Sequence, residues 1–528
     1  MGKEIGIDFG TTNTVVSYIN KKGKLRPLRY EGNDVIPSAI YFLSKNEYEI
    51  GKRARRLIST NRNKAGIINF KPKIGEKEKY DVVAENGDEF SICPREVARL
   101  FLNKVVRGLE EKLIKEFGPI DGCIDRVVIT VPAKFSSTEK EATRKAAQKA
   151  GLKTAKLAAE PTAAAIAYQN DLGDDSNKDD AILVYDFGGG TFDVSIIRKE
   201  RGTFNEIATG GDKTLGGNKL TVSLEEELLN RINDEYGMEL PFEEDDFDEE
   251  LCEMSLDAYR RNMIEIYEKA NSMKEDLSEQ NTVTSICNII IQNGKTVDYE
   301  AEFSRDELED YIRDDIAQTV DITMQTIKEA KDQGVDKIDQ IVLAGGSSNI
   351  PLVKEMLEDS LKENKVIYSD DVSTLISRGA AVMAKNIQDI NNLTEQITNV
   401  QLGVAATEGV QYGKFQVIIL ENEQLPCSKT RKFNLVQDGQ RRLEVIYYER
   451  DIKNYPNAVR IDDEGINEID TLIIDNLPAG LKKDNTVIEV KFTAQKDGSL
   501  DIDVDIKDLK GNSIKHGDLS IAKESDLE

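Results

Sequence analysis

A phrase that occurs twice is the feature that most constrains the fold of this chain. It reads IGIDFGTTNTVVSYI near the start and LVYDFGGGTFDVSII later, with Asp8 and Asp186 at matching places. In both copies an apolar run leads to Asp-Phe-Gly, and small and hydroxyl-bearing residues follow. An apolar run that ends in glycine is typical of a buried strand followed by a sharp turn. The repeat therefore predicts two related half-domains, each of which contributes one loop to a shared cleft.

Each repeated loop carries groups suited to phosphate and to a hydrated cation. Glycine lets a ligand approach the backbone closely, and consecutive N–H groups can surround phosphate oxygens. The two aspartates can hold Mg²⁺ through water, because this ion gives up its hydration shell reluctantly. One Asp-x-Gly-Thr after a strand is more often an ordinary turn, but two copies in one register favour a phosphate-binding cleft. The predicted phosphate-binding residues are Gly10, Thr11 and Thr12 in the first loop and Gly188, Gly189, Gly190 and Thr191 in the second.

Composition excludes several classes of function. Among 528 residues, 97 acidic side chains outnumber 70 basic ones, so the net charge is -27. This balance argues against nucleic-acid binding as a main role, because such binding needs a basic face. The only histidine, His516, excludes a histidine-based triad or a multi-histidine metal site. Scattered cysteines without a C-x-x-C pair indicate a cytoplasmic protein, and we expect neither a membrane span nor a secretory signal.

The pattern of predicted elements changes after residue 385. Up to that point, apolar strands alternate with longer helical stretches, which indicates an α/β architecture. Residues 386–400 read as a polar linker. Residues 401–515 contain strands separated by turns and are expected to form a mostly antiparallel β sandwich, with residues 516–528 as a short tail.

A third glycine-rich turn is compatible with two interpretations. The segment IVLAGGSSNIPLVKEML combines an apolar strand, Gly345, Gly346, Ser347 and a helix that begins near Pro351. It fits an ordinary strand–helix turn with a serine cap. It fits about as well a close approach of the backbone to a nucleoside, and the residues alone leave both interpretations open.

Several segments together resemble the DnaK-type heat-shock chaperone family. Those in the first part are IDFGTTNT, ITVPAKF, AAEPTAAAIAY, YDFGGGTFDVSI, TLGGNKL and VLAGGSSNIPLV, in the family's order and at roughly its spacings. LGV, ENEQLP, IYYERD and FTAQKDGSLDIDV extend the resemblance to about residue 510. It implies an α/β actin-like ATPase domain of two related lobes at residues 1–385, followed by an all-β sandwich peptide-binding domain at residues 401–515.

The resemblance also assigns roles to individual residues. Lys71, in FKPKIG, matches the family's catalytic lysine, although alone it reads as a solvated loop residue. Glu160, in AEPTAAA, matches a carboxylate that orients metal and water, although alone it is typical of a helix start before Pro161. The implied cofactors are ATP or ADP with Mg²⁺, and K⁺ as a candidate further ion. The other implied site residues are Asp8, Asp186 and Asp193 at the metal, Thr191 in catalysis, and Asn13, Gly216, Gly217, Lys274, Gly345, Gly346 and Ser347 at the nucleotide.

The chain departs from the family pattern on the nucleoside side of this site. Asn271 stands where the family has a glutamate three residues before Lys274, Asn349 replaces a stacking arginine, and Ser373 replaces an aspartate. TLGGNKL also lacks the acidic pair that normally follows its glycines. Each interaction left unmade costs about 1–3 kcal/mol, so we expect ATP to bind less tightly than is usual for the family.

The regions assigned to coupling and partners depart as well. The linker has isolated Leu393 and Ile397 where the family has consecutive apolar residues. Lys156 and Ala159 replace an arginine and an asparagine near the family's J-domain docking face. A J-domain cochaperone and a nucleotide-exchange factor are therefore open partners, and the coupling between the domains is an open question.

Two residues align with the family's peptide groove. Val436 falls on an arch position and Leu443 on the central apolar pocket, but both also fit as ordinary core residues of a sandwich. An extended apolar peptide held by backbone hydrogen bonds would suit such a surface. The last residues are too few for the family's helical lid, so we expect rapid peptide exchange.

Three functions are compatible with these features. The leading one is an ATP-dependent chaperone that hydrolyses ATP and binds extended apolar segments of unfolded proteins. The alternative is a nucleotide-regulated binding or scaffold module with little or no ATP turnover. A sugar kinase of the same ATPase superfamily is a distant third, because the β domain would then lack a purpose. None of the three needs a nucleic acid or a membrane as partner.

Overall fold

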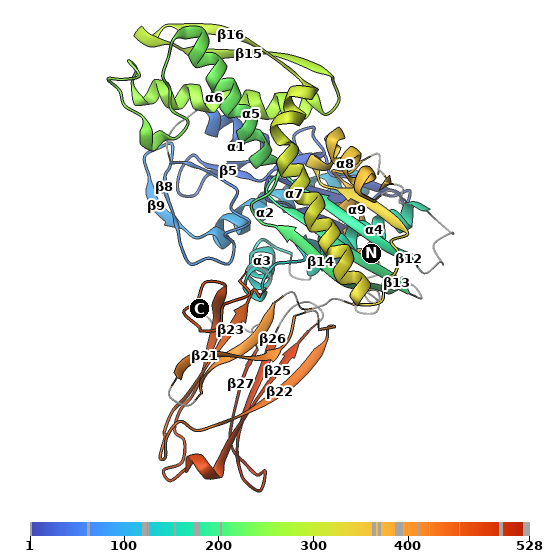
Figure 1. Ribbon diagram of the computed structural model, residues 1–528, viewed down its shortest axis with the longest axis vertical. Helices are drawn as coiled ribbons and strands as arrows, with labels where there is room; N and C mark the ends of the chain where they lie inside the picture. Colours follow the sequence, from blue (N-terminus) through green and yellow to red (C-terminus); the bar gives the residue numbers. More distant parts are fainter. Residues whose placement is uncertain are drawn as a thin grey trace.

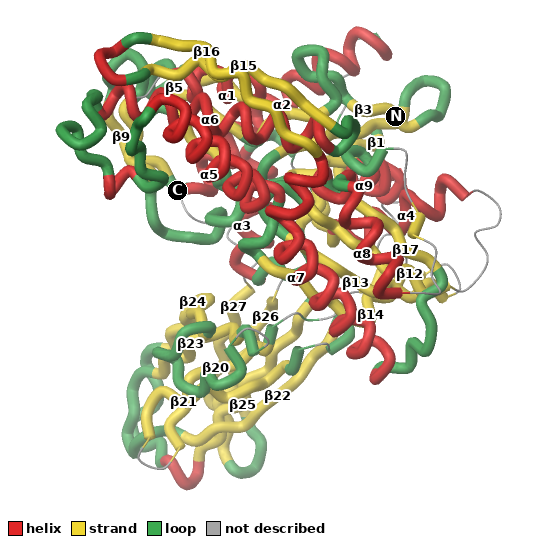
Figure 2. The backbone as a smooth tube through the Cα atoms, turned by 45° about the horizontal axis from the view of Figure 1, so that its top comes forward, coloured by secondary structure: helices red, strands yellow, loops and turns green. Residues whose placement is uncertain are grey.

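The chain forms a mixed α/β part followed by a part made of strands (Figure 1). The computed structural model describes residues 3–60, 64–118, 124, 126–152, 155–172, 180–200, 203–361, 366–367, 371–385, 394–395, 398, 400–408, 411–421, 423–452, 455–495 and 500–520. Within these residues no helix is long and apolar enough to cross a membrane. Both Figure 1 and Figure 2 show the strands of the second part gathered below the helices and sheets of the first.

The first repeated phrase lies in a six-stranded sheet. β1 (Glu4–Phe9) pairs in parallel with β10 (Arg126–Val131) and antiparallel with β2 (Asn13–Ile19). The sheet order is β11-β10-β1-β2-β3, with β4 paired to β2. The outer strands are β11 (Lys156–Ala159), β3 (Leu25–Pro27) and β4 (Val35–Pro37). Asp8 is therefore the last but one residue of β1, and the first repeated loop follows one residue later, before β2 begins at Asn13.

The second phrase lies in another six-stranded sheet with the same pairing at its centre. β12 (Asp180–Phe187) pairs antiparallel with β13 (Phe192–Glu200) and in parallel with β17 (Gln340–Ala344). The order is β18-β17-β12-β13-β14-β19. The remaining strands are β14 (Thr203–Asp212), β18 (Val366–Ile367) and β19 (Thr394–Glu395). Each repeated loop thus follows a strand that has one parallel and one antiparallel neighbour, as two related half-domains require.

Two helices rich in small residues join the sheets. α4 (Glu160–Leu172) and α9 (Leu375–Lys385) pack closely on each other; α4 contacts strands of both sheets, and α9 contacts strands of the first. A Cβ on Gly379 would lie only 1.8 Å from the backbone oxygen of Ala163. A Cβ on Gly6 would likewise lie 2.1 Å from the backbone oxygen of Ser377. Glycine and alanine at these contacts let the backbones approach, which holds the two repeated loops at a fixed separation.

The other elements surround this framework, and their ends follow local signals. α3 begins after Ser136, whose hydroxyl accepts from the backbone of Glu139 in a reciprocal capping box. α8 begins at Pro351, as predicted. The flanking helices are α1 (Gly51–Thr60), α2 (Pro94–Phe117), α3 (Ser137–Lys149), α5 (Gly217–Tyr236), α6 (Leu256–Leu277), α7 (Arg305–Asp332) and α8 (Pro351–Leu361). The smaller sheets consist of β5 (Ala39–Phe42), β6 (Tyr48–Ile50) and β7 (Gly66–Ile68), of β8 (Tyr80–Val83) and β9 (Glu89–Ile92), and of β15 (Thr282–Ile290) and β16 (Thr296–Ser304).

The second part consists of two antiparallel four-stranded sheets around one apolar core. Leu500, Ile502, Val504 and Ile506 are buried, while the aspartates between them are partly exposed, as their alternation predicts. The first sheet has the order β21-β20-β23-β24 and contains β20 (Gln401–Glu408), β21 (Gln411–Ile419), β23 (Leu443–Arg450) and β24 (Ile466–Ile474). The second has the order β22-β25-β26-β27 and contains β22 (Cys427–Asn434), β25 (Thr486–Ala494), β26 (Leu500–Asp508) and β27 (Ser513–Ser520).

Candidate functional site

A cavity of about 840 Å³ lies where the two repeated loops meet and gathers most of the predicted site residues. Of the residues predicted to bind metal or nucleotide, Asp193 and Gly216 do not line it, but both lie directly behind the lining. Asp193 pairs with Asp186 in the sheet register, and a Cβ on Gly216 would lie 2.4 Å from the backbone of Gly190. The predicted residues that line the cavity are Asp8, Gly10, Thr11, Thr12, Asn13, Lys71, Glu160, Asp186, Gly188, Gly189, Gly190, Thr191, Gly217, Lys274, Gly345, Gly346 and Ser347.

The two repeated loops touch each other at this cavity. A Cβ on Gly189 would lie 2.3 Å from Oγ1 of Thr12, and one on Gly190 would lie 2.8 Å from Cγ2 of Thr11. The hydroxyl oxygen of Thr12 is buried and has no hydrogen-bond partner among the described residues. Such a group is costly unless something hydrogen-bonds to it. A phosphate oxygen bound between the loops would satisfy it, so the loops fit the phosphate ligand that the sequence predicts.

A buried ion pair lies beside the loops. Nζ of Lys71 donates to Oε1 of Glu160 at 2.8 Å, and the two side chains are 2% and 7% exposed. The interpretation of Lys71 as a solvated loop residue is therefore wrong. Glu160 is also the first residue of α4, so its position at a helix start and its position in the cavity are compatible.

Burial, and after it repulsion between the carboxylates of the site, raises the pKa values of three aspartates. Desolvation, followed by repulsion from Glu160, raises the pKa of Asp8 to about 7 and that of Asp193 to about 6. The same two causes hold the pKa of Asp186 well above its ordinary value. Lys71 opposes the shift in all three cases but does not cancel it. A bound divalent cation would neutralise this excess of negative charge.

The geometry of these carboxylates favours a hydrated ion over a directly coordinated one. In the part of the chain that the structure describes, no three His, Cys, Asp or Glu side chains converge closely enough to hold a metal ion. Mg²⁺ usually keeps several waters and binds through one or two carboxylates together with phosphates. The residues present therefore fit Mg²⁺ held by Asp8, Asp186 and Asp193 through water and by phosphate oxygens.

The far end of the cavity is built around a second buried lysine. Nζ of Lys274 donates to the backbone oxygen of Gly217 at 2.7 Å, to Oγ1 of Thr221 at 2.7 Å and to Oδ1 of Asn271 at 3.2 Å. All three acceptors are neutral. Burial lowers the pKa of Lys274 to about 8. This end of the cavity therefore holds an ammonium group whose hydrogen bonds are satisfied but which, among the residues that the structure describes, has no carboxylate in direct contact.

The third glycine-rich turn closes the cavity between the two ends. Oγ of Ser347 donates to the backbone oxygen of Gly188 at 2.9 Å, which ties the turn to the second repeated loop. Gly345 has a φ of +79°, and a Cβ there would lie 2.6 Å from Oδ1 of Asp186. Both open interpretations of the segment are thus compatible with one structure, since it is a strand–helix turn that lines the cavity.

Sequence reasoning missed several residues of the cavity wall. Arg55 lines it from α1, and its Nε lies 3.6 Å from Oε1 of Glu268 on α6. Lys52 and Asn33 also line it. No local signal separates these residues from ordinary exposed polar side chains. The departures from the family pattern on the nucleoside side also fall on its wall, which includes Asn271, Asn349, Ser373 and Asn218, the residue that follows the glycines of TLGGNKL.

The residues assigned to peptide and to coupling lie away from the cavity. Val436, between β22 and β23, is 62% exposed, whereas Leu443 is 8% exposed and packs in the apolar core. Their assignment to a peptide groove stays a prediction. Leu393 and Ile397 lie outside the described residues. Within the predicted linker, β19 pairs in parallel with β14 and extends the second sheet.

Comparison with known proteins identifies the family. The Hsp70 protein family matches residues 4–527 of this chain. Chaperone protein DnaK of Mycoplasmopsis pulmonis is 30% identical over 100% of this chain and 80% of its own length. The protein of the same name from Mycoplasmoides gallisepticum is 30% identical over 100% and 82%, and that from Thermotoga petrophila is 29% identical over 96% and 78%. The cavity between paired sheets and the strand-rich second part thus occur in a chain that belongs to the Hsp70 protein family.

Proposed function

We propose that this chain is an ATP-dependent chaperone that hydrolyses ATP in the cavity and binds extended apolar segments of unfolded proteins with its strand-rich part. The observation that carries the proposal is the buried pair of Lys71 and Glu160, which lies against two glycine-rich loops and two aspartates. The relatives that match over nearly the whole chain are named as DnaK chaperones, which supports the same function.

The residues of the cavity suit phosphoryl transfer to water. This reaction depends on positioning and charge neutralisation more than on a covalent nucleophile. Backbone N–H groups of the two loops would bind phosphate oxygens, and Lys71 would supply a positive charge in a place from which water is largely excluded. Mg²⁺, when bound, would neutralise phosphate charge. Asp8, Asp186 and Thr191 would orient the water and its hydrogen bonds, with Glu160 holding Lys71 in place.

The strand-rich part suits an extended peptide. Val436 exposes an apolar side chain between β22 and β23, next to the strand that begins with Leu443. An extended apolar segment could combine backbone hydrogen bonds with one side chain in a pocket. J-domain cochaperones and nucleotide-exchange factors belong to the same proposal, since the relatives carry the DnaK name.

Single-turnover hydrolysis of ATP, measured with and without an apolar peptide, tests the proposal. We expect hydrolysis that the peptide accelerates and that Lys71→Ala reduces about 10²- to 10³-fold, the usual effect of losing one group that stabilises developing charge. Lys73→Ala is the matched control, because Lys73 is an exposed lysine two residues away. Its rate should equal that of the wild type.

Three outcomes would contradict the proposal. Binding of ATP without turnover would favour the nucleotide-regulated module instead. A hydrolysis rate that no apolar peptide changes would show that the strand-rich part does not regulate the cavity. An equal loss of hydrolysis rate in Lys71→Ala and Lys73→Ala would show that the buried ion pair of Lys71 and Glu160 takes no part in hydrolysis.

A further inference from the structure

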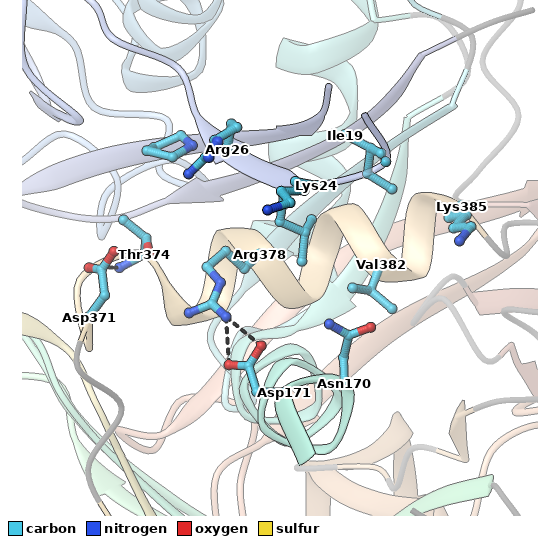
Figure 3. Close-up of a pocket in the computed structure, with 13 residues that line it drawn as sticks. Ile19, Lys24, Arg26, Asn170, Asp171, Asp371, Thr374, Arg378, Val382 and Lys385 are labelled. Atoms are coloured by element: carbon cyan, nitrogen blue, oxygen red, sulfur yellow. Dashed lines mark hydrogen bonds and ion pairs between the residues drawn. The ribbon is translucent and has the colours of Figure 1, made fainter. Parts of the chain in front are cut away.

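A second cavity, of about 580 Å³, lies along α9 and plays no part in the proposed chemistry. Its walls are the β2–β3 hairpin, the end of α4 and one face of α9, as Figure 3 shows. We call it the α9 pocket. Its volume is within the range of sites that take small molecules. Asp371 lines both this pocket and the first cavity, so the two share a wall at the start of α9.

One face of α9 supplies a row of pocket residues. Thr374, just before the helix, is followed at intervals of four, four and three by Arg378, Val382 and Lys385, and all four line the pocket. This spacing places them on one side of a helix. Arg378 and Lys385 are separated by two turns, or about 10 Å along the helix axis. A ligand that contacts both must therefore carry more than one anionic group.

The hairpin adds two more cations. Lys24, just before β3, and Arg26, within β3, line the pocket opposite α9, and Figure 3 shows Lys24 lying between the hairpin and the helix. In the described part of the chain, the side chains of Lys24, Arg26 and Lys385 form no hydrogen bond or ion pair. Their charges therefore face the pocket without a direct partner among the described residues.

The two carboxylates of the pocket are engaged with their neighbours. Both oxygens of Asp171 accept from Nη2 of Arg378 at 2.5 Å. Asp371 accepts from the backbone N–H of Thr374 at 3.2 Å and from its hydroxyl at 2.5 Å. Four cations against two carboxylates leave the pocket positive, although the whole chain carries a net charge of -27. A concave positive site on an acidic protein concentrates small anions.

We propose that the α9 pocket binds a phosphorylated small molecule with two or more phosphate groups. Phosphate suits the donors, because lysine acts as a compact charge and arginine as a planar fork for phosphate oxygens. A pocket of this volume accommodates a molecule of up to about nucleotide size. Its occupant would lie beside the first cavity, across the shared residue Asp371, without entering it.

Titration calorimetry of the whole chain with inorganic tripolyphosphate tests the proposal. We expect one binding event per chain that persists when ADP is present in excess and that weakens as salt is raised. Lys24→Ala combined with Arg26→Ala should weaken it at least about tenfold, since two charged contacts are lost. Lys385→Ala, from the other wall, should weaken it less but measurably.

A double variant of the same hairpin controls for loss of charge alone. Lys21→Ala combined with Lys22→Ala removes two exposed cations that do not line the pocket, and it should bind tripolyphosphate like the wild type. Equal weakening in the two double variants would overturn the proposal in favour of non-specific attraction. Loss of binding in excess ADP would assign the phosphate to the first cavity. Tighter binding of a hexaglutamate peptide than of tripolyphosphate would show that the pocket is a site for acidic polypeptide. If tripolyphosphate does not bind at all, the proposal is wrong.

Discussion

The two ends of the first cavity bury a lysine in different ways. Lys71 and Lys274 are 2% and 7% exposed, so both have left water almost completely. Lys71 has a carboxylate, Glu160, at 2.8 Å, whereas Lys274 donates only to neutral oxygens. The first arrangement pairs the buried ammonium with a carboxylate, and the second leaves an ammonium group whose pKa burial lowers to about 8. An ion pair thus holds Lys71 at one end of the cavity, whereas hydrogen bonds to neutral oxygens hold Lys274 at the other end.

The largest difference is expected when each lysine becomes methionine. Lys71→Met leaves Glu160 buried beside two aspartates without its cation, which should lower the free energy of unfolding by about 3–5 kcal/mol. Lys274→Met removes a poorly solvated charge but also its hydrogen bonds. That loss should cost only about 1–2 kcal/mol. Urea unfolding at pH 7, followed by circular dichroism, measures both values.

Lys73→Met provides the baseline for this pair of variants. Lys73 is exposed on the same segment as Lys71, so its replacement should change stability by less than about 0.5 kcal/mol. Equal destabilisation by Lys71→Met and Lys274→Met would mean that the carboxylate partner makes no difference. The contrast between the two ends would then be lost.

The next largest effect is expected at the turn between the two ends. Gly345 has a φ of +79°, and a Cβ there would lie 2.4 Å from the backbone oxygen of Phe187. Gly345→Ala should therefore destabilise the chain by about 2–4 kcal/mol through backbone strain and overlap. The adjacent Gly346 is a matched control, because nothing lies within 4 Å of a Cβ built on it. Thermal unfolding that shifts equally in Gly345→Ala and Gly346→Ala would show that the turn is not packed against the second loop.

Some residues of this site could be predicted from the sequence because they belong to local patterns, whereas others are brought together only by the fold. Asp8 and Asp186 could be predicted because strand, aspartate and glycine are adjacent in the sequence, and each loop is local. Lys71 and Glu160 are 89 positions apart, so only the fold brings them together, and without the family resemblance Lys71 looks like a solvated residue. The α9 pocket is even harder to predict, because its cations come from two segments far apart in the sequence. Lys24 and Arg26 lie near the N-terminus, and the cations of α9 lie more than 350 positions later. Local sequence patterns do not show which residues far apart in the chain will be neighbours in the fold.

The lowered pKa of Lys274 predicts that the stability contributed by this residue depends on pH. Its pKa is about 8 in the folded chain and near 10.5 when unfolded. Between these values the unfolded chain holds a proton that the folded chain lacks, so the stability contributed by this residue rises with pH. The cost of Lys274→Met should therefore grow by about 2–3 kcal/mol from pH 7.5 to pH 10.5. Urea unfolding of both proteins at several pH values measures it, and a cost that stays constant would place the lysine in a less desolvated setting.

The smallest effect concerns ATP itself and would sharpen the contrast between the two ends. Asn271 accepts from Lys274 at 3.2 Å, so Asn271→Glu places a carboxylate where the first end has Glu160. The new charge should raise the pKa of Lys274 and hold it protonated against the nucleoside, which we expect to tighten ATP binding about 5- to 10-fold, or about 1 kcal/mol. Calorimetric titration with ATP measures the change, and Glu275→Gln, which alters a carboxylate on the next residue of α6, is the control that should bind no more tightly than the wild type. Undiminished wild-type affinity and no gain in Asn271→Glu would show that neutral oxygens hold the lysine as well as a carboxylate does. The end with Lys274 would then lack the carboxylate partner that Lys71 has, but this lack would not weaken the binding of ATP.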